Sequence, residues 1–304
     1  MPGYRSHRFR SADGRLDLFA RDYPGDTPDA PALLLMHALT RNSADFEPLV
    51  DWLRPWSASG AATGPGGRFR LVVPDTRGRG RSDHDPDPAN YNPAVYAQDM
   101  FALMDDLGLA SAGLVGTSMG GLVAMAMAAT ARQGGFRGRL GPVIMNDVGA
   151  HLEPGALDRI GSYVGRSGPF ADWEEAAAAC RAVNAPVFPD FAPADWMDFA
   201  RRTCRETGEG VAYDYDPAIA VPFETESADV DLWPLWQAMD GLPVLVVRGA
   251  NSDLISAATV AEMGRRHDGP FASVEVPDRG HTPLLDEPAA RTAIQDFLSE
   301  HYPQ

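Results

Sequence analysis

The stretch Gly116-Thr117-Ser118-Met119-Gly120-Gly121 decides the fold of this chain. The short apolar run at 112–116 (AGLVG) precedes it, and an apolar segment from Met119 to Ala131 follows it. This order predicts a buried strand, a sharp turn at Ser118 and a helix buried against the sheet. A turn this tight favours glycine at positions 116 and 120, because side chains there would collide across it. It also pushes the serine hydroxyl out of the sheet edge, where the first N–H groups of the helix point.

Short apolar runs alternate with longer helical patterns along most of the chain, which is typical of a mostly parallel sheet covered by helices on both faces. Ahead of these runs, 6–10 and 16–22 alternate in character around Asp13-Gly14, which predicts an antiparallel hairpin at one sheet edge. The sequence therefore predicts the α/β class. The apolar runs are 32–37, 69–75, 113–117, 142–147, 243–248 and 271–276.

One long segment, residues 150–236, interrupts this alternation and has no clear buried strand. It is rich in aromatic residues and consists of helical pieces broken by proline. We expect it to form a helical cap over the carboxyl edge of the sheet, where open α/β sheets bind ligands. Most of its aromatic side chains should build the core of the cap, with one or two facing the substrate. The α/β core would then comprise residues 1–149 and 237–304.

Composition narrows the classes of partner. The formal net charge is −16, and all basic residues are arginine, so binding to a nucleic-acid backbone is not expected. The two cysteines, Cys180 and Cys204, belong to no CxxC or Cys/His cluster, so neither a disulfide framework nor a metal site is expected. No stretch approaches the roughly 20 apolar residues that span a bilayer. We expect a cytoplasmic protein that does not bind membranes; the sequence leaves its oligomeric state open.

A serine hydroxyl needs a neighbouring base to become a good nucleophile. His281 is the best candidate, because it lies in the loop between the last predicted strand and the last helix, at the same sheet edge as Ser118. The base in turn needs a carboxylate. Asp253, which follows the strand at 243–248, fits the order nucleophile, acid, base, and we favour it. Asp147 ends the preceding strand and is its competitor.

With these residues in place, the chain resembles the α/β-hydrolase superfamily over nearly its whole length, in the capped branch of esterases, lactonases and C–C hydrolases. The resemblance implies the α/β-hydrolase fold, a mostly parallel sheet flanked by helices with an inserted helical cap. Four segments carry it: 33–42 (LLLMHALTRN), 75–83 (DTRGRGRSD), 116–121 (GTSMGG) and 280–288 (GHTPLLDEP).

The resemblance also implies an oxyanion hole. In this family the loop after the first parallel strand usually reads His-Gly-X, and here it reads His37-Ala38-Leu39. Leu39 would supply one backbone N–H and Met119 the second. Ala38 stands where the family usually has glycine. His37 and Arg41 are candidate substrate-binding residues, with Arg41 suited to hold a substrate carboxylate.

The alternating arginines of the 75–83 segment have two interpretations. They could clamp an anion, but three alternating arginines in a glycine-rich turn more often face solvent. We favour the solvated turn. The arginines are Arg77, Arg79 and Arg81.

Together these features predict a serine hydrolase that cleaves an ester or lactone of a small-molecule substrate through an acyl-enzyme, without a metal or organic cofactor. Two alternatives stay open. The first is a C–C bond hydrolase of a ring-cleavage product with the same triad, although members of that group commonly carry a tryptophan where this chain has Thr282. The second is a ligand receptor built on the hydrolase fold.

Overall fold

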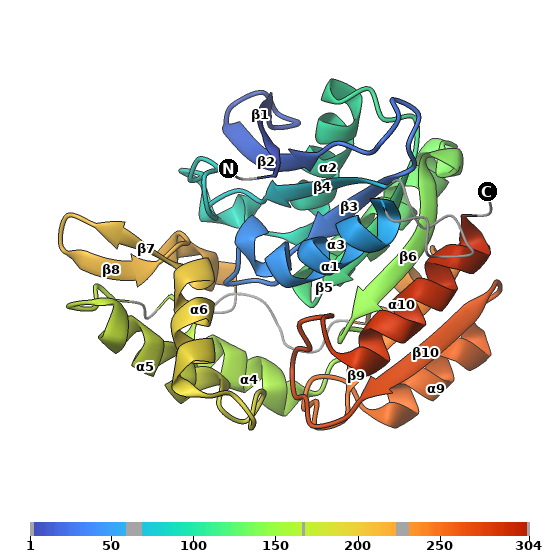
Figure 1. Cartoon of the computed structure of the whole chain (residues 1–304). Coiled ribbons are helices and arrows are strands. Elements are labelled where there is room, and N and C mark those ends of the chain that lie inside the picture. Colours follow the sequence, from blue (N-terminus) through green and yellow to red (C-terminus); the bar gives the residue numbers. More distant parts are fainter. Residues whose placement is uncertain (1–2, 59–68, 166–167, 223–230, 303–304) are drawn as a thin grey trace.

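The computed structural model describes residues 3–58, 69–165, 168–222 and 231–302. Its main sheet has eight strands in the order β1-β2-β4-β3-β5-β6-β9-β10 (Figure 1). The hairpin β1–β2 pairs antiparallel with β4 at one edge, and the other strand pairs are parallel, as predicted. The strands are β1 (Arg5–Arg10), β2 (Asp17–Tyr23), β3 (Ala32–Met36), β4 (Arg70–Asp75), β5 (Ala112–Thr117), β6 (Leu140–Asn146), β9 (Val244–Gly249) and β10 (Phe271–Val276).

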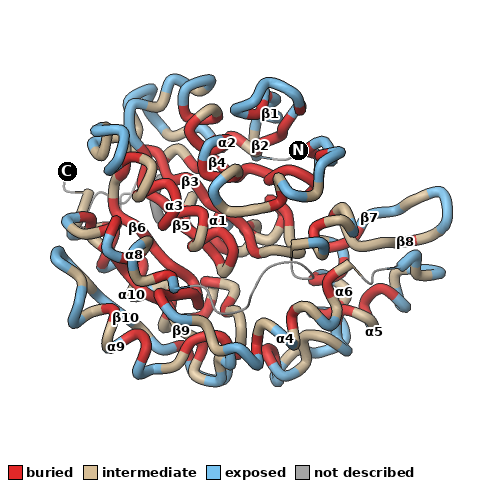
Figure 2. Tube along the Cα trace, turned by 180° about the vertical axis from the view of Figure 1, so that it is seen from behind, coloured by how far each residue is buried: buried red, intermediate tan, exposed pale blue. Residues whose placement is uncertain are grey.

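Helices cover both faces of this sheet, because the strands are apolar on both sides. One hydrophobic cluster joins the sheet to α2 (Pro93–Asp106), α3 (Met119–Gly134) and α9 (Ala257–Arg266). A second cluster joins the other face to α1 (Glu47–Ala58) and α10 (Pro288–His301). Figure 2 shows the buried residues running through the strands and α3, with exposed residues along the outer sides. In the described ranges, no helix combines the length and apolar character needed to cross a bilayer.

The sequence signals at helix ends act as expected in α2. The side chain of Asn92 accepts a hydrogen bond from the Val95 N–H, and Pro93 occupies the first turn. Gly108 follows the helix with a positive φ of 66°, a left-handed backbone conformation that glycine adopts readily. Short 3₁₀ helices complete the core and the segment before β9: η1 (Ser43–Phe46), η2 (Pro88–Asn90), η3 (Arg137–Arg139) and η4 (Pro217–Ala220).

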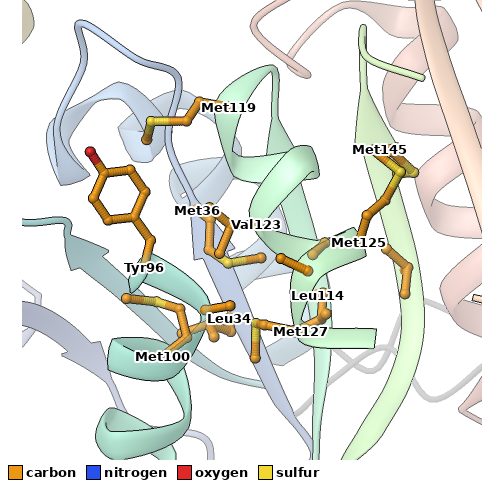
Figure 3. Close-up of a cluster of buried hydrophobic side chains, with 14 of the residues drawn as sticks. Leu34, Met36, Tyr96, Met100, Leu114, Met119, Val123, Met125, Met127 and Met145 are labelled. Carbon is orange, nitrogen blue, oxygen red and sulfur yellow. The ribbon is translucent and has the colours of Figure 1, made fainter. Parts of the chain in front are cut away.

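Helix α3 is fixed against the sheet by a methionine-rich cluster (Figure 3). Met125 and Met127 on α3 are fully buried, as are Met36 on β3 and Met145 on β6. Unbranched thioether side chains fill irregular gaps well, so packing accounts for these methionines. The cluster holds the start of α3 in place, and with it the turn at Ser118.

We call residues 150–236 the cap segment, and its described residues between 150 and 222 lie at the lower left in Figure 1, beside the main sheet. It has a hydrophobic cluster of its own that includes Phe188, Trp196 and Phe199, so these aromatic residues do build a local core. The segment also contains an antiparallel hairpin, β7–β8, that was not predicted from the sequence. Its elements are α4 (Pro154–Tyr163), α5 (Trp173–Asn184), α6 (Pro193–Thr203), β7 (Cys204–Thr207), β8 (Gly210–Tyr213) and α8 (Trp233–Gln237), of which α8 packs on α3.

Candidate active site

Ser118 occupies the strained turn between β5 and α3. Its backbone has φ 50° and ψ −112°, a left-handed conformation that a residue with a side chain rarely adopts. A Cβ on Gly116 would overlap the carbonyl of Gly120, and a Cβ on Gly120 would overlap the carbonyl of Met36. The predicted need for glycine on both sides of the serine is therefore confirmed.

A continuous chain of hydrogen bonds starts at this serine. Ser118 Oγ lies 2.9 Å from His281 Nε2, and His281 Nδ1 lies 2.7 Å from Asp147 Oδ2. A carboxylate can only accept a hydrogen bond, so Nδ1 carries the proton and Nε2 of the neutral imidazole is free to accept from the serine hydroxyl. The side chains of His281 and Asp147 are 6% and 0% exposed, so little water competes for these bonds.

Asp147 follows β6 directly and is held by the last residue of the neighbouring strand β9 and by the loop after it. Its Oδ1 accepts from the Gly249 N–H at 2.9 Å, and its Oδ2 accepts from the Ser252 hydroxyl at 2.7 Å. Asp147 also has a positive φ of 55°. These bonds keep the buried carboxylate satisfied and aimed at the imidazole.

The expectation that Asp253 holds the imidazole is corrected by this geometry. Asp253 lies four residues past the end of β9, and its carboxylate accepts two hydrogen bonds from Arg159 on α4, at 2.6 and 2.8 Å. β6 and β9 are adjacent parallel strands, so aspartates after either strand reach the same sheet edge. Of the two, Asp147 takes the position beside His281, whereas Asp253 is held by Arg159.

The predicted oxyanion residues have backbone N–H groups without a protein partner. Within the described residues, neither the Leu39 nor the Met119 N–H donates a hydrogen bond. The Leu39 carbonyl accepts from Arg79 Nε at 3.0 Å, while Arg79 Nη1 donates to the Tyr96 hydroxyl at 2.7 Å. Arg79 thereby fastens the loop after β3. The sequence does not reveal this role of Arg79, since its only signal is a position in the glycine-rich 75–83 segment.

His37 holds the loop after β3 through hydrogen bonds inside the protein, and its side chain is not accessible to a substrate. It is fully buried, its Nδ1 donates to the Ala38 carbonyl at 2.7 Å, and its Nε2 accepts from the Thr76 N–H at 3.1 Å. Burial lowers the pKa of His37 to about 3, so the imidazole is neutral. The expectation that His37 binds substrate is therefore corrected, because both ring nitrogens are occupied inside the loop.

Arg41 links the same loop to the cap segment. Its guanidinium donates to Asp45 at 3.2 Å and to Asn184 on α5 at 3.3 Å, and it lies 4.0 Å from the ring centroid of Phe199 on α6. These contacts engage the group that was expected to hold a substrate carboxylate. Arg41 therefore bridges the core and the cap segment, and its binding of a substrate carboxylate stays a prediction.

The solvated-turn interpretation of the alternating arginines is wrong for two of the three. Arg77 and Arg79 are buried, and Arg77 makes two hydrogen bonds with Asp99 and one with Asp85. Arg81 alone of the three is exposed. Buried arginines need such partners, and Asp85 and Asp99 are too far along the chain for local sequence to reveal the pairing.

Known proteins resemble the chain over almost its full length. The model of the alpha/beta hydrolase family matches residues 7–294. A 3-hydroxybutyrate-oligomer hydrolase from Cupriavidus necator is 35% identical over 285 residues, 90% of each chain. A 2-(acetamidomethylene)succinate hydrolase from Mesorhizobium japonicum is 29% identical over 269 residues, covering 88% of this chain and 86% of the relative. The crystal structure of an alpha/beta hydrolase from Novosphingobium aromaticivorans is 37% identical, with a TM-score of 0.84 and coverage of 98% and 99%.

Proposed function

This chain belongs to the alpha/beta hydrolase family and is a hydrolase, and we propose that it cleaves carboxylic esters through a serine acyl-enzyme. The observation that carries the proposal is the hydrogen-bond chain from Ser118 through His281 to Asp147. Nucleophile, base and carboxylate come from three loops that meet at the carboxyl edge of the sheet. This arrangement serves acyl transfer, because each group activates or orients the next.

In the first half of the reaction, Ser118 Oγ attacks the ester carbonyl while His281 Nε2 takes the hydroxyl proton. The carboxylate of Asp147 stabilises the resulting imidazolium. Negative charge develops on the carbonyl oxygen, which accepts hydrogen bonds from the Leu39 and Met119 N–H groups. His281 then returns the proton to the departing alcohol, leaving an acyl-serine. In the second half, His281 activates a water molecule that releases the acid by the same steps in reverse.

We propose that the substrates are esters of short hydroxy acids, of the kind named for the Cupriavidus necator relative. Identity of 35% across 90% of both chains supports a shared bond type. In a linear 3-hydroxybutyrate oligomer, each residue is joined to the next by a carboxylic ester. Lactones contain the same bond in cyclic form, so the same chemistry opens them.

The test compares wild type with Ser118→Ala on the linear 3-hydroxybutyrate dimer and on p-nitrophenyl butyrate. We expect wild type to hydrolyse both, and the variant to lose about 10³-fold or more in kcat. A fluorophosphonate should label wild type and leave the variant unlabelled. Full activity in Ser118→Ala would overturn the proposal. Labelling of wild type without turnover of esters or lactones would favour a receptor, and turnover of a vinylogous ketone in preference to esters would favour a C–C hydrolase.

A further inference from the structure

Helix α4 of the cap segment is attached to the loop that positions Asp147. The N–H of Glu153, just before α4, donates to the carbonyl of Leu254 at 2.9 Å. Leu254 lies two residues after Ser252, whose hydroxyl holds the Asp147 carboxylate. The first turn of α4 therefore begins beside the proposed triad.

Arg159, farther along α4, is linked through Asp253 to the loop after β9, which contacts the loop that carries His281. Its partner Asp253 belongs to the loop after β9. In the same loop, the N–H of Asn251 donates a hydrogen bond to the backbone carbonyl of Arg279, two residues before His281, at 2.8 Å. Burial raises the pKa of Asp253, but its hydrogen bonds and charge contact with Arg159, together with the nearby His281, bring the pKa below its usual value. Arg159, Asp253 and His281 thus share one electrostatic environment.

The same face of α4 extends toward the oxyanion loop. Tyr163 follows Arg159 by four residues, which places both side chains on one side of the helix. Burial raises the pKa of Tyr163, and the positive charges of Arg159 and Arg41 oppose the rise. Arg41 is two residues from Leu39. This face of α4 therefore has charged neighbours in two loops: Asp253 in the loop after β9, and Arg41 in the loop after β3.

The guanidinium of Arg159 retains donors for a ligand. Asp253 accepts from Nε and from Nη2, a bidentate contact that fixes the plane of the group. An arginine has five N–H donors. Asp253 takes two of them and the Tyr163 hydroxyl also interacts with the group, so at least two donors are left for a second carboxylate. The Arg159 side chain is 35% exposed, which leaves it accessible.

We propose that Arg159, held in place by Asp253, binds the free carboxylate of an acidic ester substrate and thereby selects acids over neutral esters. The inference rests on the proposed ester hydrolysis. The printed names of two relatives, a 3-hydroxybutyrate-oligomer hydrolase and a 2-(acetamidomethylene)succinate hydrolase, both describe substrates that carry carboxylates. On a chain of net charge −16, a positioned guanidinium provides the local attraction that an anionic substrate needs.

The test uses one ester bond in two charge states. Cleavage of the central ester is followed by chromatography for the linear 3-hydroxybutyrate dimer and for its methyl ester. The readout is the ratio of kcat/KM for the acid to kcat/KM for the methyl ester. We expect Arg159→Gln to lower this ratio about 10- to 100-fold, because a charge-assisted bidentate contact is lost. Arg159→Lys, which keeps the charge without the planar fork, should give an intermediate ratio.

Arg181→Gln on α5 is the matched control, since it removes an exposed arginine from the same segment and changes the net charge equally. It should leave the ratio at the wild-type value. A variant that folds poorly should lower kcat/KM for the acid and for the methyl ester by the same factor, so the ratio of the two values stays unchanged. A wild-type ratio in Arg159→Gln would overturn the inference, as would an equal fall in Arg181→Gln. If Ser118→Ala still abolishes cleavage of both substrates, the proposed function survives that failure.

Discussion

His281 Nδ1 lies 2.7 Å from the carboxylate of Asp147, the first residue after β6. The neighbouring candidate, Asp253, is instead bound to a cap arginine. An imidazole bound in this way presents Nε2 as an acceptor to Ser118, so the aspartate that holds Nδ1 sets the tautomer and orientation of the base. The two aspartates should therefore differ sharply in what their loss does to catalysis.

We expect Asp147→Asn to lower kcat on p-nitrophenyl butyrate by about 10³- to 10⁴-fold, because an amide neither fixes the tautomer nor stabilises the imidazolium. Asp253→Asn should be at least about 100-fold more active than Asp147→Asn on this neutral ester. Steady-state kinetics and thermal unfolding of both variants provide the measurement. A larger loss in Asp253→Asn would assign the catalytic carboxylate to the loop after β9.

The fold was predictable because its signals are local. The turn at Ser118 needs glycine on both sides, and the apolar runs around it fall where β3, β4, β5, β6, β9 and β10 occur. The acid was harder to predict, because Asp147 and Asp253 follow adjacent strands and both satisfy the expected chain order. What separates them is a contact with Arg159, 94 residues from Asp253, and no local pattern encodes it.

The contacts that hold the loop after β3 were missed for a similar reason. Arg79 acts on Leu39 from 40 residues away, and Arg77 finds its buried partner Asp99 at a distance of 22 residues. The local sequence predicts that these arginines lie in a solvated turn. Burial of a charge depends on partners that only the tertiary structure brings together.

The turn at Ser118 predicts an unequal response to two glycine substitutions. Gly120→Ala places a Cβ against the Met36 carbonyl, which cannot move without disturbing β3, so we expect a loss of about 3 kcal/mol or more in unfolding free energy. Gly155→Ala on α4 meets no atom within 4 Å and should be neutral or slightly stabilising. Denaturant unfolding of both variants tests this, and equal stabilities would show that the turn tolerates a side chain.

Ser252 is expected to act through Asp147. Its hydroxyl donates to Asp147 Oδ2 at 2.7 Å, the same oxygen that His281 contacts. Ser252→Ala should lower kcat about 10-fold with a smaller change in KM, since the carboxylate loses part of its orientation. The control is Ser256→Ala, which removes the N-cap of α9 and costs about 1 kcal/mol of stability. Equal kcat values for the two variants would exclude a positioning role for Ser252.

His37 predicts how stability depends on pH. Burial lowers its pKa in the folded state to about 3, whereas the unfolded chain has the ordinary value of 6.5. The folded state therefore excludes a proton that the unfolded state binds below pH 6.5. The contribution of His37 to stability is fully present above that pH, and falls by about 1.4 kcal/mol per pH unit as the pH drops toward 3.

His37→Gln removes this titration while keeping an acceptor for the Thr76 N–H. At pH 7.5 the variant should be less stable than wild type, because it loses the bond to Ala38 and the packing of the ring. Between pH 7.5 and pH 5 the difference in unfolding free energy between wild type and variant should shrink by about 2 kcal/mol. Only the wild-type unfolded chain binds a proton at residue 37 in this range, so only wild type loses stability through it. Urea unfolding at both pH values measures this change. A difference that stays constant would mean that His37 becomes protonated in the folded protein, and that its loop opens to admit the charge.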